Sequence, residues 1–145
     1  MSAGRLILAG AAALMMTTGA GSLVAQSKNE LPASLGDLKT AQLVEVRDQS
    51  GQVLLHGALK TSSNKPKETE REAVLESPTG QSAKGKVDVD IDHKDGVDTK
   101  GEVEVTMEKL PAMTQLELFI DGTHVSTFTT SKGGKAEVKL ERKKS

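Results

Sequence analysis

The sequence has no cysteine, tryptophan or tyrosine, and it has only two phenylalanines. Without cysteine, the chain can form no disulfide, no thiolate metal site and no thiol nucleophile. Proteins that bind sugars or single-stranded nucleic acid usually stack these ligands on aromatic side chains. Because this chain offers almost no aromatic surface, the sequence argues against both of these classes of binding protein.

An excess of charge of one sign is also missing, because 19 basic side chains stand against 20 acidic ones. This balance excludes a strongly basic nucleic-acid-binding protein of the usual kind. The catalytic spacings GxSxG, HExxH, GxGxxG and the P-loop are absent as well. The many carboxylates alternate toward solvent on the predicted strands, whereas an acid–base pair needs a buried member. We therefore predict that the protein is not an enzyme and has no small-molecule substrate.

The first 25 residues have the pattern of a secretory signal peptide. Arg5 supplies the positive charge, and the uncharged stretch Leu6–Met16 has the length of a signal core, about 7–15 residues. Small residues follow, so that Ala20, Ser22 and Ala25 each mark a candidate cleavage site, of which we favour Ala25. The alternative is a retained membrane anchor formed by the same apolar region.

Both interpretations of the N-terminus predict export, to the periplasm or out of the cell. The absence of cysteine suits a bacterial envelope or secreted protein that is stable without disulfides. After the signal region no apolar run is long enough to span a bilayer, so no transmembrane segment is predicted in the mature chain.

The remainder of the 145-residue chain has the composition of one globular domain, with 36% hydrophobic and 27% charged residues. Residues 26–39 mix Ser, Asn, Pro, Gly and Asp, which is typical of a linker or a loosely packed lead-in. Residues 40–142 form the predicted domain, and residues 143–145 a basic tail. We expect the tail to be solvated; the alternative is contact with an anionic surface.

Residues 40–142 alternate apolar and polar side chains in short runs between turn signals, and helical spacing is nowhere sustained. This pattern predicts an all-β fold. We expect an antiparallel β-sandwich of the immunoglobulin or fibronectin kind with about seven to eight strands, with a small barrel as the alternative. Asp121-Gly122 is the strongest hairpin signal, and the polar stretch 60–70 is expected to be a loop. The expected strands cover residues 42–47, 53–56, 73–75, 86–92, 102–108, 115–120, 124–130 and 136–140.

One part of this region resembles a known class of domain. Residues 102–140 combine Val103-Glu104-Val105, Leu110-Pro111, the strand that ends in Ile120-Asp121-Gly122, and Ala136-Glu137-Val138. In this order the elements resemble small exported bacterial β-sandwich domains without an assigned function. The resemblance implies a sandwich and brings no activity with it.

Two of the expected strands, 86–92 and 102–108, carry carboxylates on one face and apolar side chains on the other. If they pair as a hairpin with Val87 opposite Met107, their apolar faces coincide. The carboxylates of the two strands then necessarily lie opposite one another, and like charges in this position destabilise a sheet.

In this pairing Asp92 lies opposite Glu102, and Asp90 opposite Glu104. A divalent cation such as Ca²⁺, which prefers oxygen ligands, would relieve the repulsion. The sequence thus offers Asp90, Asp92, Glu102 and Glu104 as candidate metal ligands and calcium as the candidate ion. The alternative is a solvated acidic face that nearby lysines balance.

The three histidines, His56, His93 and His124, all lie near expected strand ends or turns. Grouped together with an aspartate, they would suit zinc or copper. Because no HxH or HxxxH spacing brings them together, we expect exposed and unrelated histidines.

These observations predict a non-enzymatic exported module of the bacterial envelope, either structural or for interaction with a protein partner that the sequence does not identify. Its contact surfaces would be exposed sheet edges and the threonine-rich strand 123–130, which suits strand addition. The alternative function is a calcium-binding envelope protein that uses the acidic hairpin.

Overall fold

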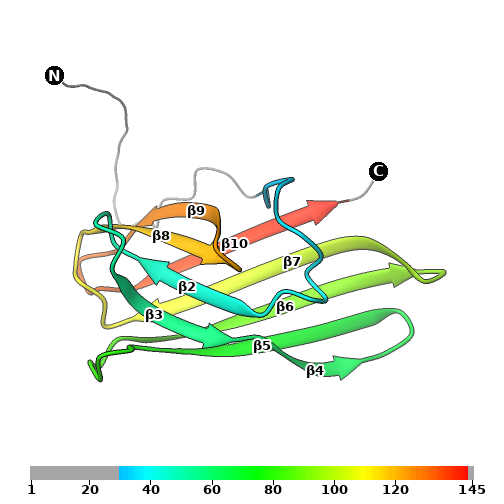
Figure 1. The fold of residues 1–145 in the computed structure, drawn as a ribbon, viewed down its shortest axis with the longest axis horizontal. Helices are drawn as coiled ribbons and strands as arrows, with labels where there is room; N and C mark the ends of the chain where they lie inside the picture. Colours follow the sequence, from blue (N-terminus) through cyan, green and yellow to red (C-terminus); the bar gives the residue numbers. More distant parts are fainter. Residues whose placement is uncertain (1–29, 144–145) are drawn as a thin grey trace, which may run out of the picture.

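The computed structural model of the protein describes residues 30–143, which contain nine strands and no helix (Figure 1). No stretch within this range is a helix able to cross a membrane. The strands are β2 (Leu43–Arg47), β3 (Val53–Ala58), β4 (Lys60–Asn64), β5 (Glu68–Glu76), β6 (Lys84–Lys94), β7 (Val97–Glu108), β8 (Gln115–Ile120), β9 (Thr123–Thr129) and β10 (Ala136–Lys143).

The strands form one antiparallel sheet in the order β10-β7-β6-β5-β3-β2-β8-β9, with β4 paired to β5. The all-β prediction is confirmed. The strands form one nearly closed, barrel-like sheet, which fits the predicted alternative of a small barrel, and the predicted sandwich is not confirmed. The long strands β6 and β7, with 11 and 12 residues, allow the natural twist to coil one sheet around its own apolar face. The predicted loop 60–70 instead contains β4 and the start of β5, which raises the number of strands to nine.

The core is aliphatic and lines the inner face of the coiled sheet. Inward positions follow the two-residue period of each strand, because successive side chains point to opposite faces. Phe128 on β9 is the one aromatic side chain among the buried residues of the described range. The largest fully buried side chains are Phe128, Leu55, Leu75, Ile91, Leu116, Leu118, Ile120, Leu140, Val44, Val46, Val87 and Val89.

The segment before β2 packs against this core. Of the expected lead-in 26–39 the structure describes residues 30–39, and Leu31, Leu35 and Leu38 are buried there. The Leu31 amide donates a hydrogen bond to the Glu141 carbonyl at 2.9 Å, which places this segment beside the end of β10 (Figure 1). The Arg142 side chain donates to the carbonyls of three lead-in residues, Pro32, Leu35 and Gly36. Residues 30–39 therefore belong to the folded domain.

Residues 1–29, with the predicted signal peptide, and residues 144–145 of the basic tail lie outside the described range.

Two hairpins turn on Asp-Gly pairs. Asp121 and Gly122 have φ values of 49° and 79°, and Asp95 and Gly96 have 54° and 78°. Two successive residues with positive φ are typical of the tight type I′ turn, whose twist matches that of the strands. The hairpin predicted at Asp121-Gly122 is confirmed.

Candidate functional site

The outward side chains of β5, β6, β7 and β10 form an acidic face. Glu70 on β5 lies opposite Asp90 on β6, which lies opposite Glu102 on β7, which lies opposite Glu141 on β10. One row across four neighbouring strands is therefore acidic throughout. In the adjacent row only β10 contributes a cation, and its members are Glu72, Asp88, Glu104 and Lys139.

The observed pairing of β6 and β7 differs by two residues from the expected one. Val87 lies opposite Val105 rather than Met107, so Asp90 faces Glu102 and Asp92 faces Lys100. The turn contains only two residues, and one irregularity follows between Asp92 and His93. The shift was invisible in the sequence because a slip of two residues returns every side chain to the same face. The expectation of carboxylates facing each other was right for the hairpin, but the predicted partners were wrong.

Lysines balance most of the acidic face. The shorter ion pairs join Lys139 Nζ to Glu104 Oε2, Lys100 Nζ to Glu102 Oε2 and Lys84 Nζ to Glu108 Oε2, each at 3.4 Å. Among the described residues no lysine pairs with Asp90. Burial, followed by the charges of Glu70, Glu68, Glu102 and Asp88, raises the pKa of Asp90 above its ordinary value.

Three carboxylates converge at one end of the acidic row. Glu68, Glu70 and Asp90 each offer an oxygen, and these oxygens lie within 4.8 Å of one another. Of the four predicted metal ligands only Asp90 belongs to this group, because β5 rather than β7 supplies its two partners. The sequence did not indicate them, since the strand that carries Glu68 and Glu70 was expected to be a loop.

Neutralising Asp90 is expected to stabilise the protein. Asp90→Asn removes a carboxylate that faces an acidic side chain on either side, and we expect a gain of about 0.5 kcal/mol in the free energy of unfolding at neutral pH. Urea unfolding followed by far-UV circular dichroism measures this gain. Because the folded-state pKa is raised, the penalty is present at neutral pH and disappears as the pH falls through that pKa. The gain should therefore vanish in acid.

Asp92→Asn is the matched control, because Asp92 faces Glu68 on one side but the cation Lys100 on the other. It should give no gain. An Asp90→Asn protein that is less stable than the wild type would contradict the repulsion argument.

A second cluster surrounds His93, whose side chain is only 9% exposed. The ring nitrogens lie 2.8 Å from Asp98 Oδ1, through Nδ1, and 2.7 Å from Thr69 Oγ1, through Nε2. Asp98 Oδ1 also lies 3.2 Å from Lys39 Nζ, and Thr69 Oγ1 donates to Asn64 Oδ1 at 2.9 Å. The expectation of exposed, unrelated histidines is wrong for His93, because the irregularity next to it in β6 breaks the alternation on which the expectation rested.

The order hydroxyl, imidazole, carboxylate is also that of a catalytic triad. Thr69, however, is only 5% exposed, and its hydroxyl already donates to Asn64. The nucleophile of a triad must be presented to its substrate. The Thr69 hydroxyl is not, so the cluster joins strands and does not form a hydrolytic centre.

The other two histidines lie apart from His93. His56 is exposed on β3, and His124 on β9 has a side chain that is 46% exposed. His124 Nε2 lies 2.8 Å from Thr127 Oγ1, and its ring meets the edge of Phe119 at 5.5 Å between centroids. The Arg47 guanidinium lies over the same Phe119 ring, 4.2 Å from its centroid. One of the two phenylalanines thus forms part of an Arg47–Phe119–His124 patch on the outer face of β2, β8 and β9.

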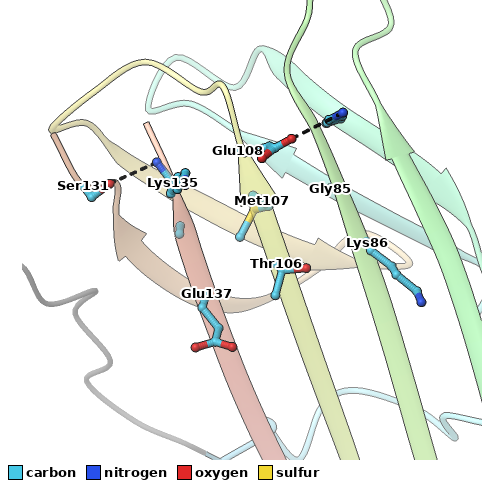
Figure 2. Close-up of a pocket in the computed structure, with 10 residues that line it drawn as sticks. Gly85, Lys86, Thr106, Met107, Glu108, Ser131, Lys135 and Glu137 are labelled. Carbon is cyan, nitrogen blue, oxygen red and sulfur yellow. Dashed lines mark hydrogen bonds and ion pairs between the residues drawn. The ribbon is translucent and has the colours of Figure 1, made fainter. Parts of the chain in front are cut away.

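A hollow of about 530 Å³ lies over β6, β7 and the start of β10 (Figure 2). Lys84, Lys86 and Lys135 line it together with Glu108 and Glu137. Because the two signs are mixed and Lys84 pairs with Glu108 at 3.4 Å, the hollow does not select a ligand of one charge.

Within residues 30–143 the sheet has three edges, β10, β4 and β9, and they differ in protection. The outward side chains of β10 alternate acid and base, and the Leu31 amide already bonds to its Glu141 carbonyl. The edge strand β4 has five residues, begins with Lys60 and is irregular after Thr61. The third edge, β9, has seven residues without lysine, arginine, carboxylate or proline. Charges and proline are two of the usual devices that keep an edge from pairing, and β9 has neither. Its one irregularity lies at Val125, between Ser126 and His124, where the pairing with β8 shifts.

No family model, curated protein or solved structure matches this chain. The resemblance of residues 102–140 to exported bacterial β-sandwich domains therefore stays a prediction.

Proposed function

We propose that the protein is a non-enzymatic interaction module of the bacterial envelope and that β9 accepts an extended segment of a partner protein by strand addition. The observation that carries the proposal is an edge without charge or proline: among the described strands β9 pairs only with β8, and its seven residues include no lysine, arginine, carboxylate or proline. Strand addition uses backbone hydrogen bonds for affinity and neighbouring side chains for specificity.

The hydrogen-bond pattern of the β8–β9 ladder supports the proposal. The Thr130 amide donates to the Thr114 carbonyl at 2.9 Å, just beyond the ladder. Hydrogen-bonded and non-hydrogen-bonded pairs alternate in an antiparallel ladder. The pair of Thr130 with Thr114 is of the hydrogen-bonded kind. The pairs that contain Thr129 and Thr127 lie one and three positions before Thr130 on β9, so they are of the non-hydrogen-bonded kind. The backbone N–H and C=O groups of both threonines thus point away from β8, toward an added strand.

The outer face beside this edge has the composition of a contact surface. The Arg47–Phe119–His124 patch lies on the strands that precede the edge, and arginine and aromatic side chains are enriched where protein partners bind. Alternate side chains of an added strand would lie next to His124 and Thr127.

Export is part of the same proposal, and the pattern of residues 1–25 supports it. We expect the mature protein to begin at Gln26, after cleavage at Ala25, and to be periplasmic or secreted. Intact-mass measurement of the protein from the cell envelope fraction checks this. A mature chain that still contains Met1–Ala25 in the cytoplasmic fraction would contradict it.

Photocrosslinking in cells that produce the protein tests the interaction. A benzoylphenylalanine in place of Thr129, exposed on β9, should give a discrete adduct with one partner. The matched position is Thr106, also an exposed threonine but on β7, which has a paired strand on both sides. Adducts that are absent, or identical at both positions, would contradict binding at the β9 edge.

A second candidate function is divalent-cation binding, and the convergence of Glu68, Glu70 and Asp90 favours it. A ligand that binds only the folded state raises the melting temperature. Thermal unfolding by circular dichroism in chelator, in millimolar calcium and in magnesium separates the two functions. A calcium-specific rise in Tm that Asp90→Asn abolishes would place cation binding first. Equal Tm values in the two cations support the interaction module.

A further inference from the structure

We propose that the segment added at β9 is β9 of a second copy of this chain, so that the protein forms a two-fold dimer through this edge. The proposal rests on strand addition at β9 and names the partner. Its basis is residues 126–130, Ser-Thr-Phe-Thr-Thr, which are nearly symmetric in sequence around Phe128. Two identical antiparallel strands need this symmetry, because a two-fold axis pairs each position with the one equally far from the axis on the other side.

The directions of the backbone groups place the axis at Phe128. The outward N–H and C=O groups on β9 belong to Thr127 and Thr129, which flank Phe128. With the axis there, Thr127 of one copy lies opposite Thr129 of the other, and each such pair exchanges two backbone hydrogen bonds. The two pairs form four bonds in all. An axis at Thr127 would instead pair Thr129 with Val125, where the ladder to β8 is irregular.

The side chains of residues 115–130 bring no like charges together in this pairing. On the outer face Thr127 of one copy meets Thr129 of the other, and cross-strand threonine pairs are favourable in sheets. On β8, Glu117 lies opposite Thr127, and Gln115 lies opposite Thr129. Each row across the interface therefore holds a single charge, that of Glu117. Arg47 on β2 lies opposite Glu117 and balances it.

The inner face of the pairing is apolar at its centre. Phe128 is 1% exposed and belongs to the core of its own barrel, with Leu116 opposite it on β8. At the axis the two copies of Phe128 form a non-hydrogen-bonded pair, the kind in which the side chains lie closer together. Aromatic cross-strand pairs stabilise a sheet. The apolar layers of the two barrels would thus meet at the axis.

The other edges within residues 30–143 are less suited to a second copy. On β10 the Glu141 carbonyl already accepts a hydrogen bond from the Leu31 amide. The strand β4 has five residues, begins with Lys60 and is irregular after Thr61. We therefore expect one dimer contact, at β9.

Sedimentation equilibrium of the full mature protein, at concentrations up to millimolar, tests the proposal. The wild type should show a reversible monomer–dimer equilibrium. In Thr127→Lys/Thr129→Lys each new lysine faces a lysine of the other copy, so the dissociation constant should rise at least about tenfold. Thr127→Glu/Thr129→Glu should dissociate in the same way. An equimolar mixture of the two variants should dimerise again, because each lysine then faces a glutamate.

The matched control is Thr99→Lys/Thr106→Lys, which adds the same charge at two exposed threonines of β7. It should dimerise like the wild type. The wild type and the two lysine variants decide even if the glutamate variant does not fold. A wild type that stays monomeric, or a dimer that both lysine variants weaken equally, would overturn the proposal.

Photocrosslinking at Thr129 in cells separates failure of this proposal from failure of strand addition. An adduct with the mass of two chains supports pairing between copies. An adduct with a different protein would overturn the second copy as the partner and leave strand addition at β9 intact. No adduct at Thr129 would overturn both.

Discussion

Replacing Arg71 by methionine should destabilise the protein by about 3 kcal/mol, the largest effect that we expect from one side chain. Arg71 is 7% exposed and lies on the inner face of β5. Its Nη1 donates to the carbonyls of Leu38 and Ala41, and its Nη2 to the carbonyl of Leu59 at 3.2 Å. Methionine fills a similar length but donates nothing. Each buried carbonyl without a partner costs about 1–3 kcal/mol, which the removal of a buried charge offsets in part.

Two comparisons isolate this effect in urea unfolding monitored by circular dichroism. Arg71→Lys keeps the charge, but an ammonium group lacks the planar fork that reaches several carbonyls, so the loss should be intermediate. Arg142→Met also removes three bonds to carbonyls but at a more exposed position, and we expect about 1 kcal/mol. An Arg71→Met protein no less stable than Arg142→Met would show that Arg71 does not hold the lead-in and the β3–β4 connection together.

Gly134→Ala should cost about 3 kcal/mol as well, for a steric reason. Gly134 has φ at 74°, and a Cβ there would lie 2.2 Å from the Leu110 carbonyl oxygen. The two backbones cannot separate freely, because the Leu110 amide donates to the Gly134 carbonyl at 3.0 Å.

Gly122→Ala is the control for the backbone strain alone. Gly122 has φ at 79° with nothing within 4 Å of the added Cβ, so we expect a cost of about 1 kcal/mol. Equal losses for the two variants in the same urea measurement would show that the contact with Leu110 relaxes at no cost.

The strands with one buried and one solvent-exposed face could be predicted from the sequence, because their apolar and polar residues alternate. The alternation in residues 86–92, 102–108 and 115–120 lies within β6, β7 and β8, because each strand has one face in the core and one in water. The Asp121-Gly122 turn could be predicted because few residues adopt two successive positive φ values.

The lead-in and Arg71 were not predictable in the same way. Leu31, Leu35 and Leu38 stand among polar and turn-forming residues and show none of the two-residue alternation by which the strands were predicted, so that pattern did not indicate that they are buried. The signal for Arg71 was present but faint, since the inward alternation of Leu75 and Ala73 continues back to it. The expected loop ended at residue 70 and the expected strand began at residue 73, so the prediction assigned Arg71 to neither.

The candidate sites depended on features that a sequence does not carry. The pairing of β6 with β7 is set by a short turn and one irregularity, and both a two-residue slip and the true register keep the apolar faces together. Asp90 on β6 lies between β7 and β5. That β5 is the second neighbour depends on the order of strands in the sheet, which the residues near Asp90 do not indicate. Glu68 and Glu70 could therefore not be named, and the partners of His93 come from three separate segments.

The most direct test of the interaction proposal is whether binding requires the outward N–H of Thr127. The partner segment that crosslinks at Thr129, made as a synthetic peptide, is titrated calorimetrically against the purified mature protein. Thr127→Val keeps the amide and should bind like the wild type. Thr127→Pro removes the amide without breaking a bond to β8, and its affinity should fall at least about tenfold, the equivalent of about 1.4 kcal/mol. Equal affinity of the proline and valine variants would contradict strand addition at β9.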